Sequence, residues 1–293
     1  MKNLMIPALA LFLSAAAQAD DSPLWMRYCA ISPDGQTIAF SYQGDIYTVP
    51  SSGGKARQLT THPAHDTRPV WSPDGQRIAF ASNRSGNFDV FLMNKEGGEP
   101  KRLTTHSTNE YPTTFKDNGH ILYLANVLQD AKDIQFPGTR FMQVYEISTD
   151  GGRPDLYSSL YMENIALSKD GSKLLYNDYK GYEDPWRKHH QSSITRDIWL
   201  CTLGKDRSFQ KVTTFGGEDR NPVWAADGAS FYYLSEEKGS FNIFKKDLAG
   251  NNEKQITTHT THPVRFLTSD NSGFFNDTEN TEIYTLSLHH PLP

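Results

Sequence analysis

One segment gathers most of the side chains that could hold a ligand by charge. It reads Trp186-Arg187-Lys188-His189-His190, so an aromatic ring, two permanent cations and two imidazoles follow one another. Arg and Lys donate charge-assisted hydrogen bonds to carbonyls and carboxylates, and Trp adds apolar contact. We interpret this segment as a peptide-binding loop. The alternative is that it packs over an edge of the fold or plugs its centre.

Three further histidines, His62, His106 and His259, recur at equivalent places, each after a Thr-Thr pair. A ring of imidazoles could contact peptide carbonyls or carboxylates and titrate near neutral pH. The repetition is also typical of a purely structural hydrogen bond. We add Arg140, which ends a long insertion, to the predicted peptide-binding set.

Motifs of catalysis and of metal binding are missing from the chain. It contains no Gly-x-Ser-x-Gly, His-Glu-x-x-His, Gly-x-x-x-x-Gly-Lys or Cys-x-x-Cys. The adjacent side chains of His189 and His190 diverge, and no third ligand is fixed near them. We therefore assign no catalytic residue, no metal and no cofactor, and a triad assembled by folding has no local support.

The elements that must position these residues come from a repeat. A Ser-Pro-Asp-Gly turn or a close variant occurs six times, and its closing glycines lie at 35, 75, 119, 171, 228 and 273. The steps of 40, 44, 52, 57 and 45 residues bracket the length of a four-stranded blade, about 40 to 45 residues. Pro and Gly in these turns reverse the chain between two apolar runs.

The second copy shows the four strands most clearly. We predict strand a at 69–72, b at 77–81, c at 88–93 and d at 100–104, and apolar residues alternate with polar ones in the equivalent strands of other copies. The pattern predicts an all-β, six-bladed β-propeller. The sixth blade is incomplete, because the two prolines that follow Leu286 make the tail a poor strand d.

Alternating strand direction assigns the connections to two faces. Links a–b and c–d share one face, and links b–c and d–a share the other. The second face therefore carries the Thr-Thr-His segments and two long insertions, Val127 to Arg140 and Tyr179 to Arg196. Long loops on a rigid scaffold often bind ligands.

Composition and the N-terminus limit compartment and partners. The net charge of −5, or −6 without a leader that carries Lys2, provides no basic field for nucleic acid. Leu4 to Ala16 is apolar and Ala17-Gln18-Ala19 fits a cleavage site, which predicts a signal peptide, export to the periplasm or medium, and no membrane span. Cys29 and Cys201 fall in copies on opposite sides of the ring, so we expect no disulfide.

The predicted organisation is a signal peptide over 1–19, with cleavage after Ala19, and a propeller over 20–293. The blades are expected at about 24–62, 63–106, 107–159, 160–215, 216–259 and 260–293.

The repeat resembles that of TolB-type propellers, through Val70 to Gly75, Ile78 to Ser82 and Gly97 to Thr104. Other segments are more similar to the N-terminal propeller of secreted bacterial tricorn-like serine peptidases, over residues 22 to 287. These segments are Leu24 to Tyr28, Trp186 to His190, Thr195 to Trp199 and Gly217 to Trp224. The resemblance implies a propeller that gates peptides towards a serine protease core.

We therefore expect an exported, non-catalytic module that binds or gates peptides or unfolded polypeptide for a protease core in cis or in trans. It is expected either to act alone or to be a piece of a longer peptidase. The alternative is a TolB-like periplasmic scaffold for protein interactions, although Ala19 to Cys29 leaves no room for the α/β domain that such proteins carry first. A propeller lyase or glycosidase is a third reading.

Overall fold

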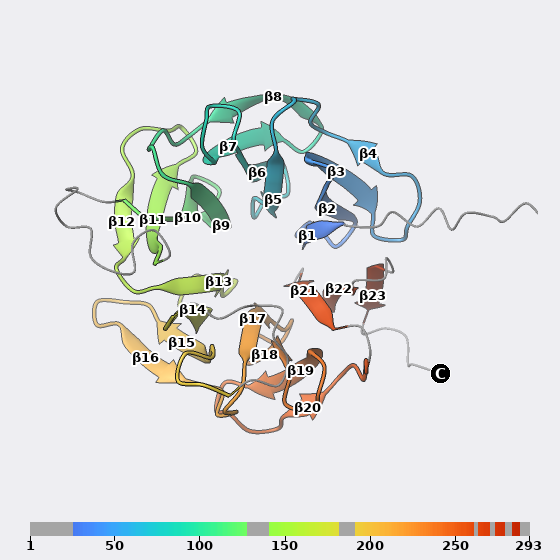
Figure 1. Cartoon of the computed structure of the whole chain (residues 1–293), viewed down its shortest axis with the longest axis vertical. Helices are drawn as coiled ribbons and strands as arrows, with labels where there is room; N and C mark the ends of the chain where they lie inside the picture. Colours follow the sequence, from blue (N-terminus) through green and yellow to red (C-terminus); the bar gives the residue numbers. More distant parts are fainter. Residues whose placement is uncertain are drawn as a thin grey trace, which may run out of the picture.

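The computed structural model describes residues 26–127, 141–181, 191–260, 263–269, 273–278 and 283–287. Across these residues the regular structure is entirely β, with no helix. The strands form five four-stranded sheets and one three-stranded sheet, arranged around a common centre (Figure 1). The chain is thus an all-β propeller with five complete blades.

Each blade is an antiparallel meander of consecutive strands. The first contains β1 (Arg27–Ile31), β2 (Thr37–Tyr42), β3 (Asp45–Pro50) and β4 (Arg57–Gln58). The second contains β5 (Asp66–Trp71), β6 (Arg77–Ser82), β7 (Asp89–Asn94) and β8 (Gly97–Arg102). The third contains β9 (Glu110–Asp117), β10 (His120–Ala125), β11 (Gln143–Ser148) and β12 (Asp155–Ser158).

The fourth contains β13 (Met162–Leu167), β14 (Lys173–Asp178), β15 (Ile198–Thr202) and β16 (Ser208–Lys211). The fifth contains β17 (Asp219–Trp224), β18 (Ser230–Ser235), β19 (Asn242–Asp247) and β20 (Lys254–Gln255). The three-stranded sheet contains β21 (Val264–Ser269), β22 (Gly273–Thr278) and β23 (Ile283–Ser287). The first strand of every sheet lies nearest the centre and the later strands lie progressively outward (Figure 1).

The Ser-Pro-Asp-Gly turns form because each side chain satisfies a backbone group. In the first blade Ser32 Oγ donates to Asp34 Oδ1 over 2.6 Å and accepts the Thr37 N–H over 3.0 Å. The Ser32 hydrogen bond, with one from the backbone of Gln36, holds the pKa of Asp34 below its usual value. Gly35 has a φ of 71°, which favours glycine. The second and fourth blades repeat the Ser–Asp hydrogen bond.

The Leu-Thr-Thr segments do not continue strand d, which corrects the strand expected at 100–104. The strand ends at Arg102, and Thr104 Oγ1 accepts the N–H of Val90 at the start of β7 over 2.9 Å. The same threonine contact occurs in the first, fourth and fifth blades. The segment is therefore held at the start of strand c, and the residues after it form the link to the next blade.

The core is divided among the spaces between neighbouring sheets. Ile46 of the first blade packs with Ile78 and Phe91 of the second, and equivalent clusters join each later pair of sheets. Trp224 adds a hydrogen bond across one such space, from its indole N–H to Ala166 O over 2.9 Å. Alternating strand residues thus bury both faces of a blade against its neighbours.

The two cysteines lie where the sequence places them, in β1 and β15, and both are free. Cys201 is buried, whereas Cys29 is only partly buried against the apolar residues of the first blade. Among the described residues, no helix has the length and apolar character needed to cross a membrane.

Candidate functional site

The predicted loop Trp186 to His190 and the predicted Arg140 lie outside the described residues. Their role in peptide binding stays a prediction. Gln191, the first described residue after the loop, lies against Gly216, because a Cβ built on Gly216 would be 3.7 Å from Gln191 Cδ. Gln191 itself therefore lies beside the link between the fourth and fifth blades.

The three repeated histidines lie in links between blades and make local contacts. His62 is exposed, and its Nδ1 accepts the N–H of Ala64 over 3.0 Å. His106 Nδ1 accepts the N–H of Thr108 over 3.2 Å in the same way. The backbone N–H of His259 donates to Asn242 Oδ1 over 2.7 Å. These contacts support a shared structural role for the first two imidazoles, while their contact with peptides remains a prediction.

Two groups of residues that the sequence analysis did not assign have the properties of a binding site. The first is the inner Arg–Tyr cluster of Tyr28, Arg68 and Tyr111, which come from the innermost strands β1, β5 and β9 (Figure 1). The Arg68 guanidinium carbon lies 5.1 Å from the centre of the Tyr28 ring and 4.3 Å from that of Tyr111. Both distances are typical of cation–π contacts.

A backbone distortion presents this cluster. Tyr28 and Arg68 have φ values of 54° and 55°, and the pairing of strands a and b shifts register there. Asn164 and Asn221 repeat the distortion in the fourth and fifth blades. All four lie four residues before the first residue of the Asp-Gly turn, so the repeat itself carries the signal. Pro112 holds that position in the third blade, where its ring fixes φ near −65°.

The cluster combines cationic and aromatic surface. Arg68 is half-buried, and no carboxylate pairs with its guanidinium in the described part of the chain. Tyr28 also contacts Phe266 of β21, with ring centres 5.0 Å apart. Burial raises the pKa of Tyr111, so its hydroxyl is neutral and can donate a hydrogen bond. An unpaired guanidinium between two aromatic rings is suited to a carboxylate on a flexible ligand.

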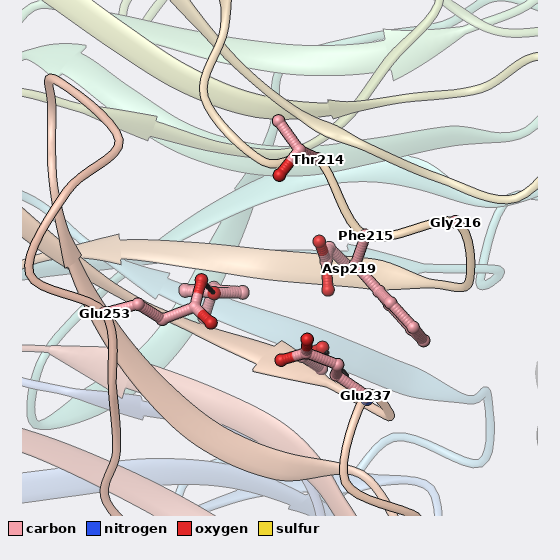
Figure 2. A pocket seen from close by; sticks show the side chains of 8 residues that line it. Thr214, Phe215, Gly216, Asp219, Glu237 and Glu253 are labelled. Carbon is pink, nitrogen blue, oxygen red and sulfur yellow. Dashed lines mark hydrogen bonds between the residues drawn. The ribbon is translucent and has the colours of Figure 1, made fainter.

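The second group lines a cavity of about 260 Å³ beside the fifth blade (Figure 2). Its residues come from the β16–β17 link, the start of β17, the end of β18 and the turns beyond, and they are Thr214, Phe215, Gly216, Asp219, Tyr233, Ser235, Glu237 and Glu253. This acidic pocket contains three carboxylates and no basic side chain.

Asp219 is the most buried of the three carboxylates, with 1% of its surface exposed. Burial raises its pKa to about 7, against hydrogen bonds from Ser235 and Thr213 that favour the charged form. Its Oδ1 atom has no hydrogen-bond partner among the described residues. A buried hydrogen-bond acceptor without a donor destabilises the protein, so a donor that reached this carboxylate would be stabilising.

The other two carboxylates stand across the cavity from Asp219 (Figure 2). Glu253 Oε2 accepts the Tyr233 hydroxyl over 2.8 Å and pairs with Lys246 Nζ at 3.0 Å. Burial opposes ionisation of Glu253, but these donors hold its pKa below the usual value. Glu237 lies within hydrogen-bond reach of Glu253. Among the described residues, no three acidic, histidine or cysteine side chains are grouped closely enough to hold a metal ion.

A buried ion-pair network borders the pocket. Arg196 donates to Glu163 over 2.9 Å and to Glu218 over 3.0 Å, and Arg220 lies 3.5 Å from Glu218. Burial lowers the pKa of Arg220 to about 10, and its guanidinium lies 4.1 Å from the centre of the Phe241 ring. The network joins the fourth blade to the start of β17. The segments Thr195 to Trp199 and Gly217 to Trp224, distinctive in sequence, thus have a structural role.

The pocket carries a sequence signal that was missed. Thr-Thr is followed by His62, His106 and His259 in three copies but by Phe215 in the fourth, where two glycines then follow. A Cβ on Gly217 would lie 2.3 Å from Phe215 Cε1, so the ring needs a glycine there.

Comparison with known proteins places these features in context. Residues 23–288 match the model of the tricorn protease N-terminal β-propeller domain. A tricorn protease homolog of Saccharolobus solfataricus is 22% identical over 283 residues, covering 91% of this chain and 25% of the relative. Tricorn protease homolog 1 of Streptomyces coelicolor is 24% identical over 255 residues, covering 86% of this chain and 22% of the relative. The chain thus spans about a quarter of the length of these relatives.

Solved structures agree on the fold. The crystal structure of the tricorn protease superposes with a TM-score of 0.73 at 20% identity, over 91% of this chain and 25% of that one. A putative TolB from Agrobacterium tumefaciens superposes with a TM-score of 0.66 at 16% identity, over 90% of this chain and 92% of that one. Likeness at these identities concerns the architecture.

Proposed function

Because this chain belongs to the tricorn protease N-terminal β-propeller family, we propose that it is a non-catalytic module that binds or gates peptides for a serine protease core, in cis or in trans. The observation that carries the proposal is the inner Arg–Tyr cluster. It offers a guanidinium without a carboxylate partner, on the innermost strands, to a chain that passes near the centre. A peptide carboxylate would complete the pairing that the described protein leaves open.

Ring closure forms part of the proposal. We infer that the three-stranded sheet is a sixth, incomplete blade. Support comes from its contacts on both sides: Ser269 Oγ donates to Trp224 O of the fifth blade over 2.8 Å, and the N–H of Ile31 in the first blade donates to Thr268 Oγ1 over 3.4 Å. A sheet that bridges the fifth and first blades completes a six-bladed ring.

The test compares fluorescent peptides that end in a free carboxylate or in an amide. The carboxylate peptide is expected to bind the full chain about tenfold more tightly, since one charge-assisted pairing is at stake. Arg68→Met is expected to remove the difference. Arg153→Met removes an exposed arginine in the β11–β12 link, and this variant is expected to retain the preference for the carboxylate peptide. Equal affinity of both peptides for the unmodified chain would refute the carboxylate site.

The predicted loop is tested separately. Substituting Arg187 and His190 together is expected to abolish peptide binding while leaving the thermal unfolding curve unchanged. The same assay applies to Arg140 and to the three histidines. Unchanged affinity in the double variant would remove the loop from the site and leave the inner Arg–Tyr cluster as the candidate.

We also propose that the protein is exported, on the basis of the apolar Leu4 to Ala16 and the small residues that end at Ala19. Intact mass of the native protein, captured by an antibody against the propeller, is the measurement. Loss of 19 residues is expected from the amino-terminal end. A retained Met1 would contradict export by this route, and a much larger species would show that the protease core is joined in cis.

The second candidate function is a scaffold that docks one folded envelope protein. The putative TolB structure favours it, because that chain matches over 92% of its length. Pull-down from an envelope extract distinguishes the two. A scaffold retains one folded protein in stoichiometric amount, whereas a peptide module retains heterogeneous peptides.

A further inference from the structure

The repeat shows what the acidic pocket lacks. The second and fifth blades are related by a shift of 153 residues, the distance between Gly75 and Gly228. In both, the first residue of strand a faces the last residue of strand b: Asp66 pairs with Ser82, and Asp219 with Ser235. The two blades therefore present the same aspartate and the same serine at the same place.

In the second blade this place is filled by an arginine. Arg84 donates from one terminal nitrogen to both carboxylate oxygens of Asp66, over 3.1 and 2.8 Å, and from Nε to Ser82 Oγ over 2.9 Å. Its guanidinium lies 5.6 Å from the ring centre of Phe80 and 4.8 Å from that of Phe91. A cation in this place is thus held by a buried carboxylate, a hydroxyl and two aromatic rings.

The fifth blade keeps every part of this arginine site except the arginine. Tyr233 and Phe244 stand where Phe80 and Phe91 stand, and their ring centres lie 5.8 Å apart, compared with 6.0 Å in the second blade. Position 237, equivalent to Arg84, holds a glutamate. The fourth blade has Lys180 at this position, but Met162 and Asp178 replace the aspartate and the serine, and Lys180 Nζ pairs with Asp197 over 2.8 Å. The fifth blade therefore keeps the aspartate and the serine of the second blade, reverses the charge at the arginine position and has a cavity.

We propose that the acidic pocket binds the guanidinium group of an arginine side chain on a ligand. The group would take the place that Arg84 takes in the second blade, donating to the carboxylate of Asp219 and to Ser235, which both line the cavity. Glu237 and Glu253 also line the cavity, where Lys238 lies 3.6 Å from Glu237 and Lys246 lies 3.0 Å from Glu253. Among the described residues no three acidic, histidine or cysteine side chains are grouped closely enough to hold a metal ion, whereas a guanidinium is planar and carries five donors.

The experiment uses the full chain and short peptides that are acetylated at one end and amidated at the other. One contains arginine, one citrulline as its neutral isostere, and one lysine; a fourth has alanine throughout and a free amino terminus. Blocking the carboxyl ends removes the group assigned to the inner Arg–Tyr cluster. A negative result with these peptides therefore does not bear on the carboxylate site of the proposed function. A negative result in the carboxylate assay likewise does not bear on the acidic pocket. Dissociation constants come from isothermal titration calorimetry.

The arginine peptide is expected to bind at least about tenfold more tightly than the citrulline peptide. Asp219→Asn is expected to remove that preference, whereas Glu99→Gln, an exposed carboxylate on another blade, is expected to keep it. Equal binding of the arginine and citrulline peptides would overturn the proposal. So would tighter binding of the lysine peptide or of the free amino terminus.

A second variant tests whether position 237 is equivalent to Arg84 of the second blade. Glu237→Arg recreates the side chain of the second blade, so it is expected to pair with Asp219, raise the melting temperature and abolish binding of the arginine peptide. Glu237→Gln, the control, is expected to weaken binding without raising the melting temperature. Persistent binding by a folded Glu237→Arg protein would overturn the proposal.

Discussion

The guanidinium carbon of Arg68 lies 4.3 Å from the centre of the Tyr111 ring, so one residue of β5 and one of β9 meet across the space between two blades. Arg68 reaches this position from a left-handed backbone conformation, with φ of 55°. Such a conformation is uncommon for a residue with a long side chain and is retained where surrounding contacts or function require it.

This contact is expected to stabilise the fold measurably. In a double-mutant cycle with Arg68→Met and Tyr111→Leu, the coupling in the free energy of unfolding is expected to be about 0.5 to 1 kcal/mol. Urea denaturation provides the four values. Tyr111→Phe keeps the ring face and is expected to keep the coupling. A coupling near zero would mean that Arg68 is held by its backbone alone.

The close approach of Phe215 to Gly217 predicts a sharp contrast between neighbouring glycines. Gly217→Ala places a methyl group against the Phe215 ring, so the ring is expected to move and the protein to lose about 1 to 3 kcal/mol of stability. Gly216→Ala, where the nearest atom is at 3.7 Å, is expected to be much milder. Thermal unfolding measures both. Equal effects would show that the ring has room to shift.

Removing Arg196 is expected to leave the buried Glu218 without its nearest partner. Arg196→Met should therefore cost about 3 to 5 kcal/mol, the usual penalty for breaking a buried ion pair from one side. The matched control is Arg57→Met, which removes an exposed ion pair with Glu96 and is expected to cost less than about 1 kcal/mol. Similar losses in the two variants would contradict a structural role for the network.

The free energy of unfolding is expected to decrease as pH rises through the range in which Glu110 is protonated in the folded state but ionised in the unfolded chain. Burial raises the pKa of Glu110 to about 7, and the negative charge of Asp89 adds to the shift against a hydrogen bond from Thr104. The unfolded chain loses this proton near pH 4.5, so between pH 4.5 and 7 the folded state binds more protons. The free energy of unfolding therefore decreases across this window and levels off above it.

Urea denaturation at pH 5 and pH 8 checks this. Glu110→Gln is expected to reduce the decrease between the two pH values by about 2 to 3 kcal/mol. Glu99→Gln, an exposed carboxylate, is expected to leave the decrease as it is. An unchanged pH profile in Glu110→Gln would show that this carboxyl is ionised in the fold.

Much of the architecture could be predicted because it depends on local chemistry. The turn residues Ser32, Asp34 and Gly35 satisfy one another within a few positions, and the same holds wherever the pattern repeats. Strand order followed from the meander. The ends of strands were less predictable. Thr104 leaves the ladder because its hydroxyl accepts an N–H of β7, a contact that depends on how the chain folds back.

The sequence alone determined the repeat, the order of the strands within a blade and the resemblance to tricorn-type propellers, since each depends on periodicity or on adjacent residues. Only the tertiary structure decided which charges meet. Asp66 and Asp219 look alike in sequence, yet one pairs with Arg84 and the other lines a cavity beside Glu237. The physical reason is that a carboxylate's pKa, burial and partners are set by side chains that the ring brings together from distant strands.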